Sequence, residues 1–110
     1  MNNLNSDHIT EIRLVPVMRD GGLTFFASCI IHNNFFIGNI ALISRLDGSG
    51  FRCVYPNKVL SNGAQIPVFY PINNKVGKLI EESLSREAVR LLDSNAKKLH
   101  GKYVFGSKQE

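Results

Sequence analysis

The pattern of apolar residues changes once along this chain, on either side of Pro71. Before it, apolar and polar residues alternate over short runs, which is typical of half-buried β-strands. After Asn73, apolar residues recur at steps of three and four, which places them along one side of a helix: Val76, Leu79, Ile80, Leu84, Ala88, Leu91 and Leu92. A proline disfavours helical backbone angles at the residue before it. We therefore expect strands within residues 9–69 and a helix over residues 73–93.

Four runs before the proline have the composition and alternation of strands. They are residues 9–18, 23–32, 35–43 and 51–55. The segments between them carry turn residues: Asp20-Gly21-Gly22, His32-Asn33-Asn34 and Asp47-Gly48-Ser49-Gly50. Pro16 lacks a backbone N–H, so we expect an edge strand or a bulge there. Gly38 indicates a bulge or a close approach of another group.

A further turn signal at Ser61-Asn62-Gly63 predicts a hairpin that leads into a short edge strand at residues 66–69. The sheet would then have four to five antiparallel strands in a meander. The helix must bury its apolar stripe, and one face of the sheet is the available partner. The predicted fold class is α+β, a small antiparallel sheet packed with a C-terminal helix.

One helix cannot cover both faces of such a sheet. The second strand is apolar on both sides, with Phe25, Ala27 and Cys29 on one and Phe26 and Ile30 on the other. A second copy over the bare face or along an edge would bury the remainder, so we expect a homodimer. The alternative is that residues 96–110 fold back over it.

The length of 110 residues fits one domain, here residues 9–93, with a tail at 1–8. Asp93-Ser94-Asn95 is expected to end or kink the helix, which leaves a basic tail at 94–110, partly disordered or a short helix. No apolar run approaches the roughly 18 residues of a membrane span, and the polar start does not resemble a signal peptide. Cys29 and Cys53 are then expected to be free thiols in a cytoplasmic protein with no membrane partner.

Charge is distributed unevenly. Basic and acidic residues balance before Lys58, and from there on nine basic residues face five acidic ones. Lys75 and Lys78 fall in the first turns of the predicted helix, where free N–H groups and the helix dipole already supply positive charge. Lysines at this position favour an anionic partner. Lys58, Lys75, Lys78 and Arg86 are therefore the candidate nucleic-acid-binding residues, and the alternative is that they only solvate the helix.

The residues that catalysis or metal binding would need are dispersed. His8, His32 and His100 lie in a terminus, a turn and the tail, without a short ligand spacing to either cysteine. The glycine pairs fit ordinary turns and no phosphate-binding motif. We expect no enzymatic activity, no cofactor and no metal.

The order of segments resembles the stage V sporulation protein G (SpoVG) family over about residues 9–92. The matching pieces are Ile9-Thr10-Glu11-Ile12-Arg13-Leu14, Phe36-Ile37-Gly38-Asn39-Ile40, Tyr55-Pro56-Asn57-Lys58 and Tyr70-Pro71-Ile72-Asn73. The resemblance implies a small antiparallel sheet, a C-terminal helix and homodimers. It also implies nucleic-acid-binding regulators linked to septation, sporulation and gene expression.

The chain departs from the family at several basic positions. Family members usually have His-Asp where this chain has Gly38-Asn39, and a second basic residue where it has Val59. An Arg and a Lys that follow the Pro-Ile-Asn step are replaced by Gly77 and Leu79. Lys58 matches in residue type, while Lys75 and Lys78 lie beside the replaced positions and are interpreted as compensating for them.

Two functions follow as hypotheses. The first is a SpoVG-like regulator that binds DNA, with RNA as a second candidate, mainly through phosphate contacts. Phe69 or Tyr70 could stack an unpaired base, or both could belong to the core. The alternative is a protein-interaction module that adds a partner strand to an exposed sheet edge and binds no nucleic acid.

Overall fold

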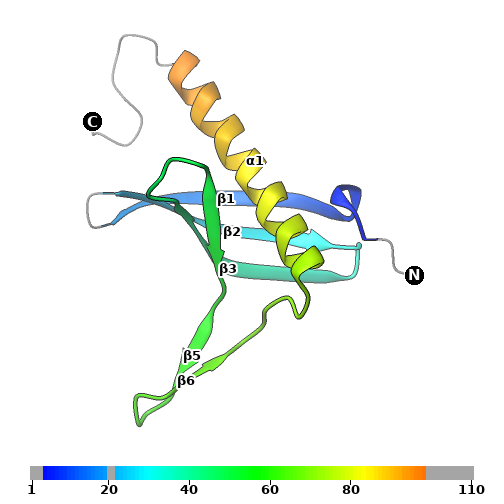
Figure 1. The fold of residues 1–110 in the computed structure, drawn as a ribbon, viewed down its shortest axis with the longest axis vertical. Helices are drawn as coiled ribbons and strands as arrows, with labels where there is room; N and C mark the ends of the chain where they lie inside the picture. Colours follow the sequence, from blue (N-terminus) through cyan, green and yellow to red (C-terminus); the bar gives the residue numbers. More distant parts are fainter. Residues whose placement is uncertain (1–3, 20–21, 99–110) are drawn as a thin grey trace.

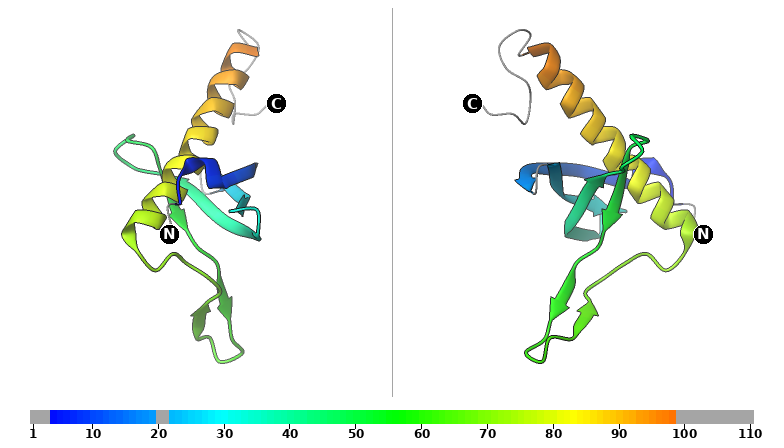
Figure 2. Two further views of the ribbon diagram at one scale, coloured as in Figure 1. Left: turned by 90° about the vertical axis from the view of Figure 1, so that its right-hand side faces the viewer. Right: turned by 60° about the vertical axis from the view of Figure 1, so that its left-hand side comes forward.

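A four-stranded antiparallel sheet and one long helix form the body of the molecule. The computed structural model describes residues 4–19 and 22–98. After a short 3-10 turn, Ser6–His8, the sheet is a meander in the order β1 (Ile9–Arg19), β2 (Gly22–Ile31), β3 (Phe35–Ser44) and β4 (Phe51–Val54). The helix α1 (Asn74–Lys98) runs across one face of this sheet (Figures 1 and 2). The predicted α+β class is confirmed.

Two bulges bend the sheet. Ala27 pairs with Ile40 and Cys29 pairs with Ile37, so β3 has one residue more than β2 between these two pairs. Within this bulge Asn39 has a φ of 59°. A Cβ on Gly38 would lie 3.0 Å from the ring of Phe36, so both reasons proposed for a glycine at this position are confirmed. The second bulge is in β1 between Thr10 and Arg13.

Pro16 lies in β1, the edge strand beside β2, as its missing N–H predicted. The turns at residues 32–34 and 47–50 form where glycine and asparagine indicated them, with the N–H of Ser49 donating to Asp47 Oδ1 at 2.9 Å. The predicted turn at Asp20-Gly21 lies outside the described residues.

The core fills the space between α1 and the sheet face beneath it. Leu84 of α1 and Leu42 of β3 are completely buried. Phe25 and Phe51 meet edge to face with their ring centroids 5.9 Å apart. The full set of buried apolar residues is Ile9, Phe25, Ala27, Cys29, Ile40, Leu42, Phe51, Ile80, Leu84 and Ala88. Sheet and helix thus share one cluster, as their separate periodicities required.

Residues 57–67 do not join this sheet. β5 (Asn57–Val59) and β6 (Gln65–Pro67) form a separate two-stranded hairpin, which we call the arm. Its turn is the predicted Ser61-Asn62-Gly63, with Gly63 at a φ of 87°. The strand expected at 66–69 is therefore shorter, begins one residue earlier and pairs only with β5. The arm projects away from the body, on the side opposite α1 (Figure 1).

The helix is longer than predicted. It continues through Asp93-Ser94-Asn95 to Lys98, whereas an end or kink was expected at residues 93–95. These residues are weak helix formers, but neither glycine nor proline follows them before Lys98, so nothing forces the backbone to leave the helix. The expectation of a tail concerns mainly residues 99–110, which lie outside the described part of the chain.

Candidate nucleic-acid interface

The start of α1 is fixed by a side-chain cap. Asn73 Oδ1 accepts a hydrogen bond from the backbone N–H of Val76 at 2.8 Å. Its carbonyl accepts one from Gly77 N–H at 3.1 Å. Asn73 is therefore the residue that caps the helix. The first turn carries Lys75 and no acidic residue, so the positive end of the helix dipole has no compensating charge there.

Three of the four predicted binding residues lie on α1. Lys75, Lys78 and Arg86 follow steps of three and eight, which brings them near one side of the helix. Lys78 and Arg86 are about 12 Å apart along the axis at 1.5 Å per residue. All three side chains are exposed. No acidic group of the described residues lies within ion-pair distance of them.

Glu82 and Arg86 lie four residues apart on α1 but form no ion pair in the described structure. On this stretch of helix Arg90 pairs with Glu87 instead, its Nε donating to Oε1 at 3.1 Å and its Nη2 to Oε2. This contact lowers the pKa of the Glu87 carboxyl and raises the pKa of Arg90. Arg86 has no ion-pair partner among the described residues, whereas Arg90 holds Glu87 in a two-point contact.

Lys58 lies apart from this group. It is on β5, in the arm, and the arm extends away from α1 in each view (Figures 1 and 2). The four candidate residues therefore do not form one cluster in the described structure. Any contact that Lys58 makes with a polyanion is a second contact, separate from the one at Lys75 and Lys78.

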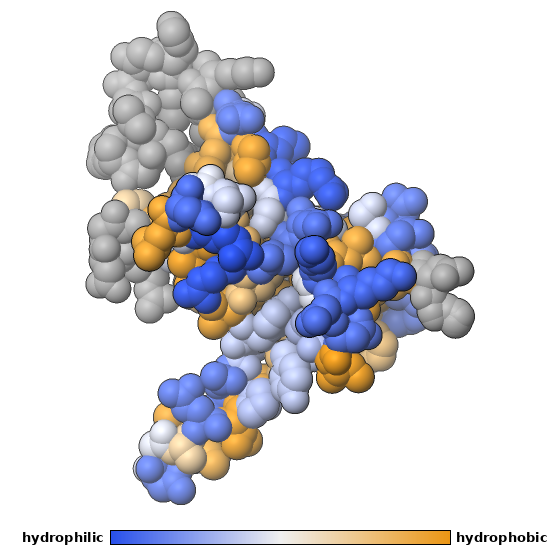
Figure 3. Space-filling view, in the orientation of Figure 1, coloured by the Kyte–Doolittle hydropathy of each residue, from blue (hydrophilic) through white to orange (hydrophobic). Residues whose placement is uncertain are grey.

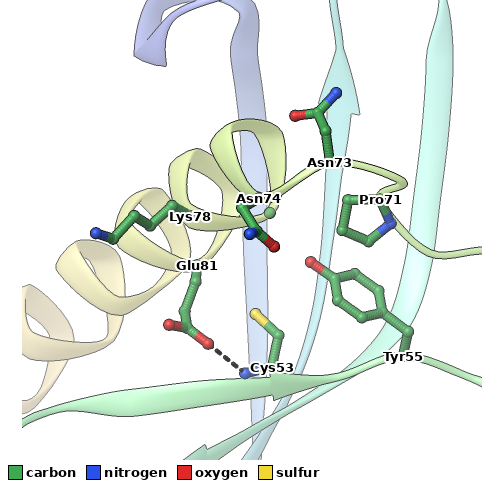
Figure 4. A pocket seen from close by; sticks show the side chains of 8 residues that line it. Cys53, Tyr55, Pro71, Asn73, Asn74, Lys78 and Glu81 are labelled. Atoms are coloured by element: carbon green, nitrogen blue, oxygen red, sulfur yellow. Dashed lines mark hydrogen bonds between the residues drawn. The ribbon is translucent and has the colours of Figure 1, made fainter.

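A pocket of about 450 Å³ opens where the helix starts (Figure 4). Tyr55 and Cys53, at the end of β4, form one wall, and Pro71 and Asn74 form the other. The Tyr55 hydroxyl is enclosed beside the Cys53 thiol and has no hydrogen-bond partner of good geometry among the described residues. Its ring packs edge to face on Phe69, with centroids 5.8 Å apart. Phe69 thus belongs to the packed interior, while Tyr70 is exposed.

Glu81 is a key residue that the sequence did not single out. Its Oε2 accepts a hydrogen bond from the backbone N–H of Cys53 at 3.1 Å, and its Oε1 accepts one from Arg45 Nη2 at 2.8 Å. One carboxylate therefore joins α1 to β4 and to the β3–β4 connection. An acid directly after buried Ile80, on the border of the apolar stripe, was the available signal.

The two thiols are held in their neutral form. Burial raises the pKa of Cys29 to about 11. Burial, and then the nearby Glu81 carboxylate, raise the pKa of Cys53 to about 11. Burial also raises the pKa of the Tyr55 phenol. At neutral pH these groups are uncharged, so the pocket's charged groups are Lys78 at its rim and Glu81, which is already paired.

Across residues 4–19 and 22–98, no cluster of three or more histidine, cysteine or acidic residues could hold a metal ion. Nor does that part of the chain include a helix both long and apolar enough to cross a membrane.

No family model matches this chain. Over 89 residues it is 30% identical to a protein of Bacillus velezensis named "Putative septation protein SpoVG". The match covers 80% of this chain and 89% of that protein. The chain belongs to the SpoVG family. The resemblance drawn from Tyr55-Pro56-Asn57-Lys58 and Tyr70-Pro71-Ile72-Asn73 is thereby supported, and the nucleic-acid-binding role of the basic residues stays a prediction.

Proposed function

We propose that this SpoVG-family protein is a nucleic-acid-binding regulator linked to septation or sporulation, and that the first turns of α1 form its main contact with the phosphate backbone. The biological setting comes from the name of its B. velezensis relative. The proposed contact with phosphate comes from the charges at the start of α1. One observation carries the proposal: two exposed lysines occupy a helix start without an acidic residue.

The physical argument is one of unfavourable charge. Lysines near a helix start destabilise it, because the dipole and the free N–H groups are already positive there. Lys75 and Lys78 have no ion-pair partner among the described residues that would offset this cost. A phosphate group placed between them and the first N–H groups would offset it, through charge-assisted hydrogen bonds. Arg86, further along the helix, supplies a contact for a later phosphate.

A salt titration of binding tests the proposal. Random-sequence duplex and single-stranded fragments are titrated by fluorescence anisotropy from about 50 mM salt upward, where phosphate contacts are strongest. Affinity should fall by roughly 0.9 log units per log unit of salt for each phosphate contact on duplex DNA. Absence of binding to both fragments at the lowest salt would reject the proposal.

Charge reversal locates the contact. Lys75→Glu with Lys78→Glu should weaken binding strongly at low salt and reduce the salt slope by roughly two units. Its thermal stability should stay level or rise, because acids suit a helix start. The matched control is Arg13→Glu with Arg52→Glu, which makes the same change of charge at exposed positions away from the helix start, neither of them in an ion pair among the described residues. Equal losses in both variants would mean that only net charge matters.

The type of nucleic acid is tested at Tyr70. Its ring is exposed and precedes the helix start by a few residues, so an unpaired base could stack on it. Tyr70→Ala should weaken binding of single-stranded RNA or DNA several-fold and leave duplex binding nearly unchanged. An equal effect on duplex and single strand would indicate that Tyr70 makes no stacking contact.

A second function has one observation in its favour. Residues 35–40 of β3 pair with β2 on one side, and no described strand pairs with their other side. Such an edge can accept a strand from another protein. The protein would then act as an interaction module without nucleic-acid binding. The same titration separates the two functions, because this one predicts no salt-dependent binding to either fragment.

A further inference from the structure

The turn of the arm contains an asparagine that is followed by a glycine. Asn62-Gly63 is the only such pair in the sequence. In this dipeptide the backbone nitrogen of the glycine can attack the side-chain amide carbon of the asparagine, because a glycine has no side chain that hinders the approach. The asparagine then loses its amide group. How readily this happens depends on how exposed and how mobile the turn is.

The turn is exposed and belongs to a weakly stabilised segment. Residues 61–68 are all exposed. In the space-filling view the arm stands clear of the body, at the lower left (Figure 3). Val59 and Ile66, one on each strand of the arm, are 64% and 46% exposed, so the arm has no core of its own. A lone two-stranded hairpin is marginally stable in water, so the turn opens far more often than the body unfolds.

Hydrogen bonds within the turn hold the reacting groups close together. The side-chain carbonyl oxygen of Asn62 accepts a hydrogen bond from the backbone N–H of Ala64 at 2.9 Å. This bond holds the side chain against the backbone that follows it and polarises the carbonyl group whose carbon is attacked. The N–H of Gly63 donates to the carbonyl of Leu60 at 2.9 Å. That bond must break before the nitrogen can attack, which requires a local opening of the turn and no unfolding of the body.

We propose that Asn62 is a site of spontaneous deamidation, and that its conversion weakens the contact of the arm with phosphate. The Gly63 nitrogen gives its proton to hydroxide and forms a bond to the side-chain carbonyl carbon of Asn62. The bond between that carbon and the side-chain nitrogen breaks, and ammonia leaves. Water then opens the cyclic imide at one or the other of its carbonyl carbons, which yields aspartate or isoaspartate. Water and hydroxide are the only co-reactants, and no group is oxidised or reduced.

Deamidation removes the net charge of the arm. Lys58 is the only charged residue between positions 57 and 67, so the formal charge of the arm is +1. The new carboxylate takes this charge to zero at neutral pH, in the same exposed hairpin as Lys58. The consequence for binding rests on the proposed function. If Lys58 contacts a phosphate, the converted arm attracts that phosphate less strongly.

Peptide mapping by mass spectrometry tests the modification itself. The protein is incubated in mildly alkaline buffer, either folded or unfolded in urea. Asn57 is the internal control, because it is an exposed asparagine of the same arm that is followed by lysine. In the folded protein, aspartate and isoaspartate should appear at Asn62 well before Asn57 is converted, and faster as the pH rises. Equal conversion at Asn57, or a folded protein that keeps Asn62 while the unfolded chain loses it, would overturn the proposal.

Two substitutions test the attack by the nitrogen of residue 63. Asn62→Gln lengthens the side chain, so that the favourable ring no longer forms, and Gly63→Ala places a Cβ beside the attacking nitrogen. Both variants should keep their side-chain amide or resist conversion at position 62 over the time in which the unsubstituted protein is converted. This should hold for Gly63→Ala although the substitution loosens the turn. Conversion of Gly63→Ala at the unsubstituted rate would overturn the ring-closure route and the proposal with it.

Asn62→Asp tests the consequence for binding, with Asn62→Gln as the uncharged control. On duplex fragments, fluorescence anisotropy should show weaker binding by Asn62→Asp and a salt slope lower by up to about one unit, whereas Asn62→Gln should bind like the unsubstituted protein. In a Lys58→Gln background the aspartate should have a smaller further effect. Equal binding by Asn62→Asp and Asn62→Gln, with binding weakened by Lys75→Glu and Lys78→Glu, would overturn the effect of deamidation and leave the proposed function intact. An unsubstituted protein that binds no nucleic acid would reject the proposed function, while peptide mapping decides the modification at Asn62 separately.

Discussion

The body and the arm are both built around β-hairpins with glycine or asparagine turns, yet they are stabilised in different ways. In the body, β2 and β3 contribute Phe25, Cys29, Ile40 and Leu42 to a core that α1 closes. In the arm, the two strands pair with each other and no described element covers them. Backbone pairing alone therefore does not make a segment stable, and a hairpin needs a surface that buries its apolar side chains.

The strongest test of this contrast removes a core side chain. Leu84→Ala should lower the free energy of unfolding by about 3 kcal/mol, because the side chain is fully buried and its removal leaves a cavity. Val59→Ala, in the arm, should lower the free energy of unfolding of a monomeric form by less than about 0.5 kcal/mol. Urea unfolding measures both. Comparable losses would show that the arm is packed as tightly as the core.

The next largest expected effect is the change in the free energy of unfolding at alkaline pH. It comes from buried groups of the body, because the arm has none of them. The folded pKa of Cys29 lies near 11 and its ordinary value is 9.0. The native thiol therefore keeps its proton at pH values where the unfolded chain has lost it. Stability is full below pH 9 and falls as the pH rises toward 11, by about 2 kcal/mol at 1.36 kcal/mol per pKa unit.

Cys29→Ala removes this contribution. Its unfolding free energy should fall less between pH 8 and pH 10.5 than that of the unmodified protein, measured with reductant present. The difference between the free energies of unfolding at the two pH values is taken within each protein, so the stability that the substitution costs at every pH cancels. Cys53 and Tyr55 also have raised pKa values, so a smaller alkaline loss remains in the variant. An unchanged pH dependence would contradict burial as the cause.

Glu81, which links α1 to the sheet, should contribute somewhat less to the free energy of unfolding than Leu84 or Cys29. Glu81→Ala leaves the Cys53 N–H without its acceptor and frees Arg45, and we expect a loss of about 1–2 kcal/mol. Glu82→Ala is the matched control, because Glu82 is an exposed neighbour with no ion pair in the described residues. Thermal unfolding compares them. Equal melting temperatures would show that the carboxylate of Glu81 is not a structural link.

The smallest global effect is expected at the turn of the arm. Gly63 has a φ of 87°, where an alanine side chain is strained. In a monomeric background, Gly63→Ala should speed hydrogen exchange of the arm amides and leave exchange in β2 and β3 unchanged. Mass spectrometry after partial deuteration separates the two regions. Faster exchange throughout the body would mean that arm and body unfold as one unit.

Much of the fold could be predicted because it depends on local signals. The strand alternation, the turn glycines, Gly38 and the Pro71–Asn73 boundary each act over a few residues, and the structure agrees with them. The end of α1 could not be placed, because Asp93-Ser94-Asn95 only weakens a helix and gives no firm stop. The separation of the arm from the main sheet was not predictable either, since a turn signal does not say which sheet a hairpin joins.

In the candidate site, too, positions that depend on local spacing were predictable and positions that depend on distant contacts were not. Lys75 and Lys78 were predicted at the start of the helix because sequence spacing fixes positions along a helix. Lys58 was grouped with them as a candidate, but its position depends on the direction of the arm, which no local pattern encodes. Glu81 was missed because its partners, Arg45 and the Cys53 N–H, come from distant parts of the sequence.

The connection between β6 and α1 has a consequence for how these regions influence each other. Residues 68–72 lead directly from the arm to the Asn73 cap, and the N–H of Val68 donates to the carbonyl of Pro56 at 3.0 Å at the base of the hairpin. A short tether of this kind gives the helix start little freedom to reorient independently. Anchoring the hairpin would therefore also set the direction in which the leading lysines point.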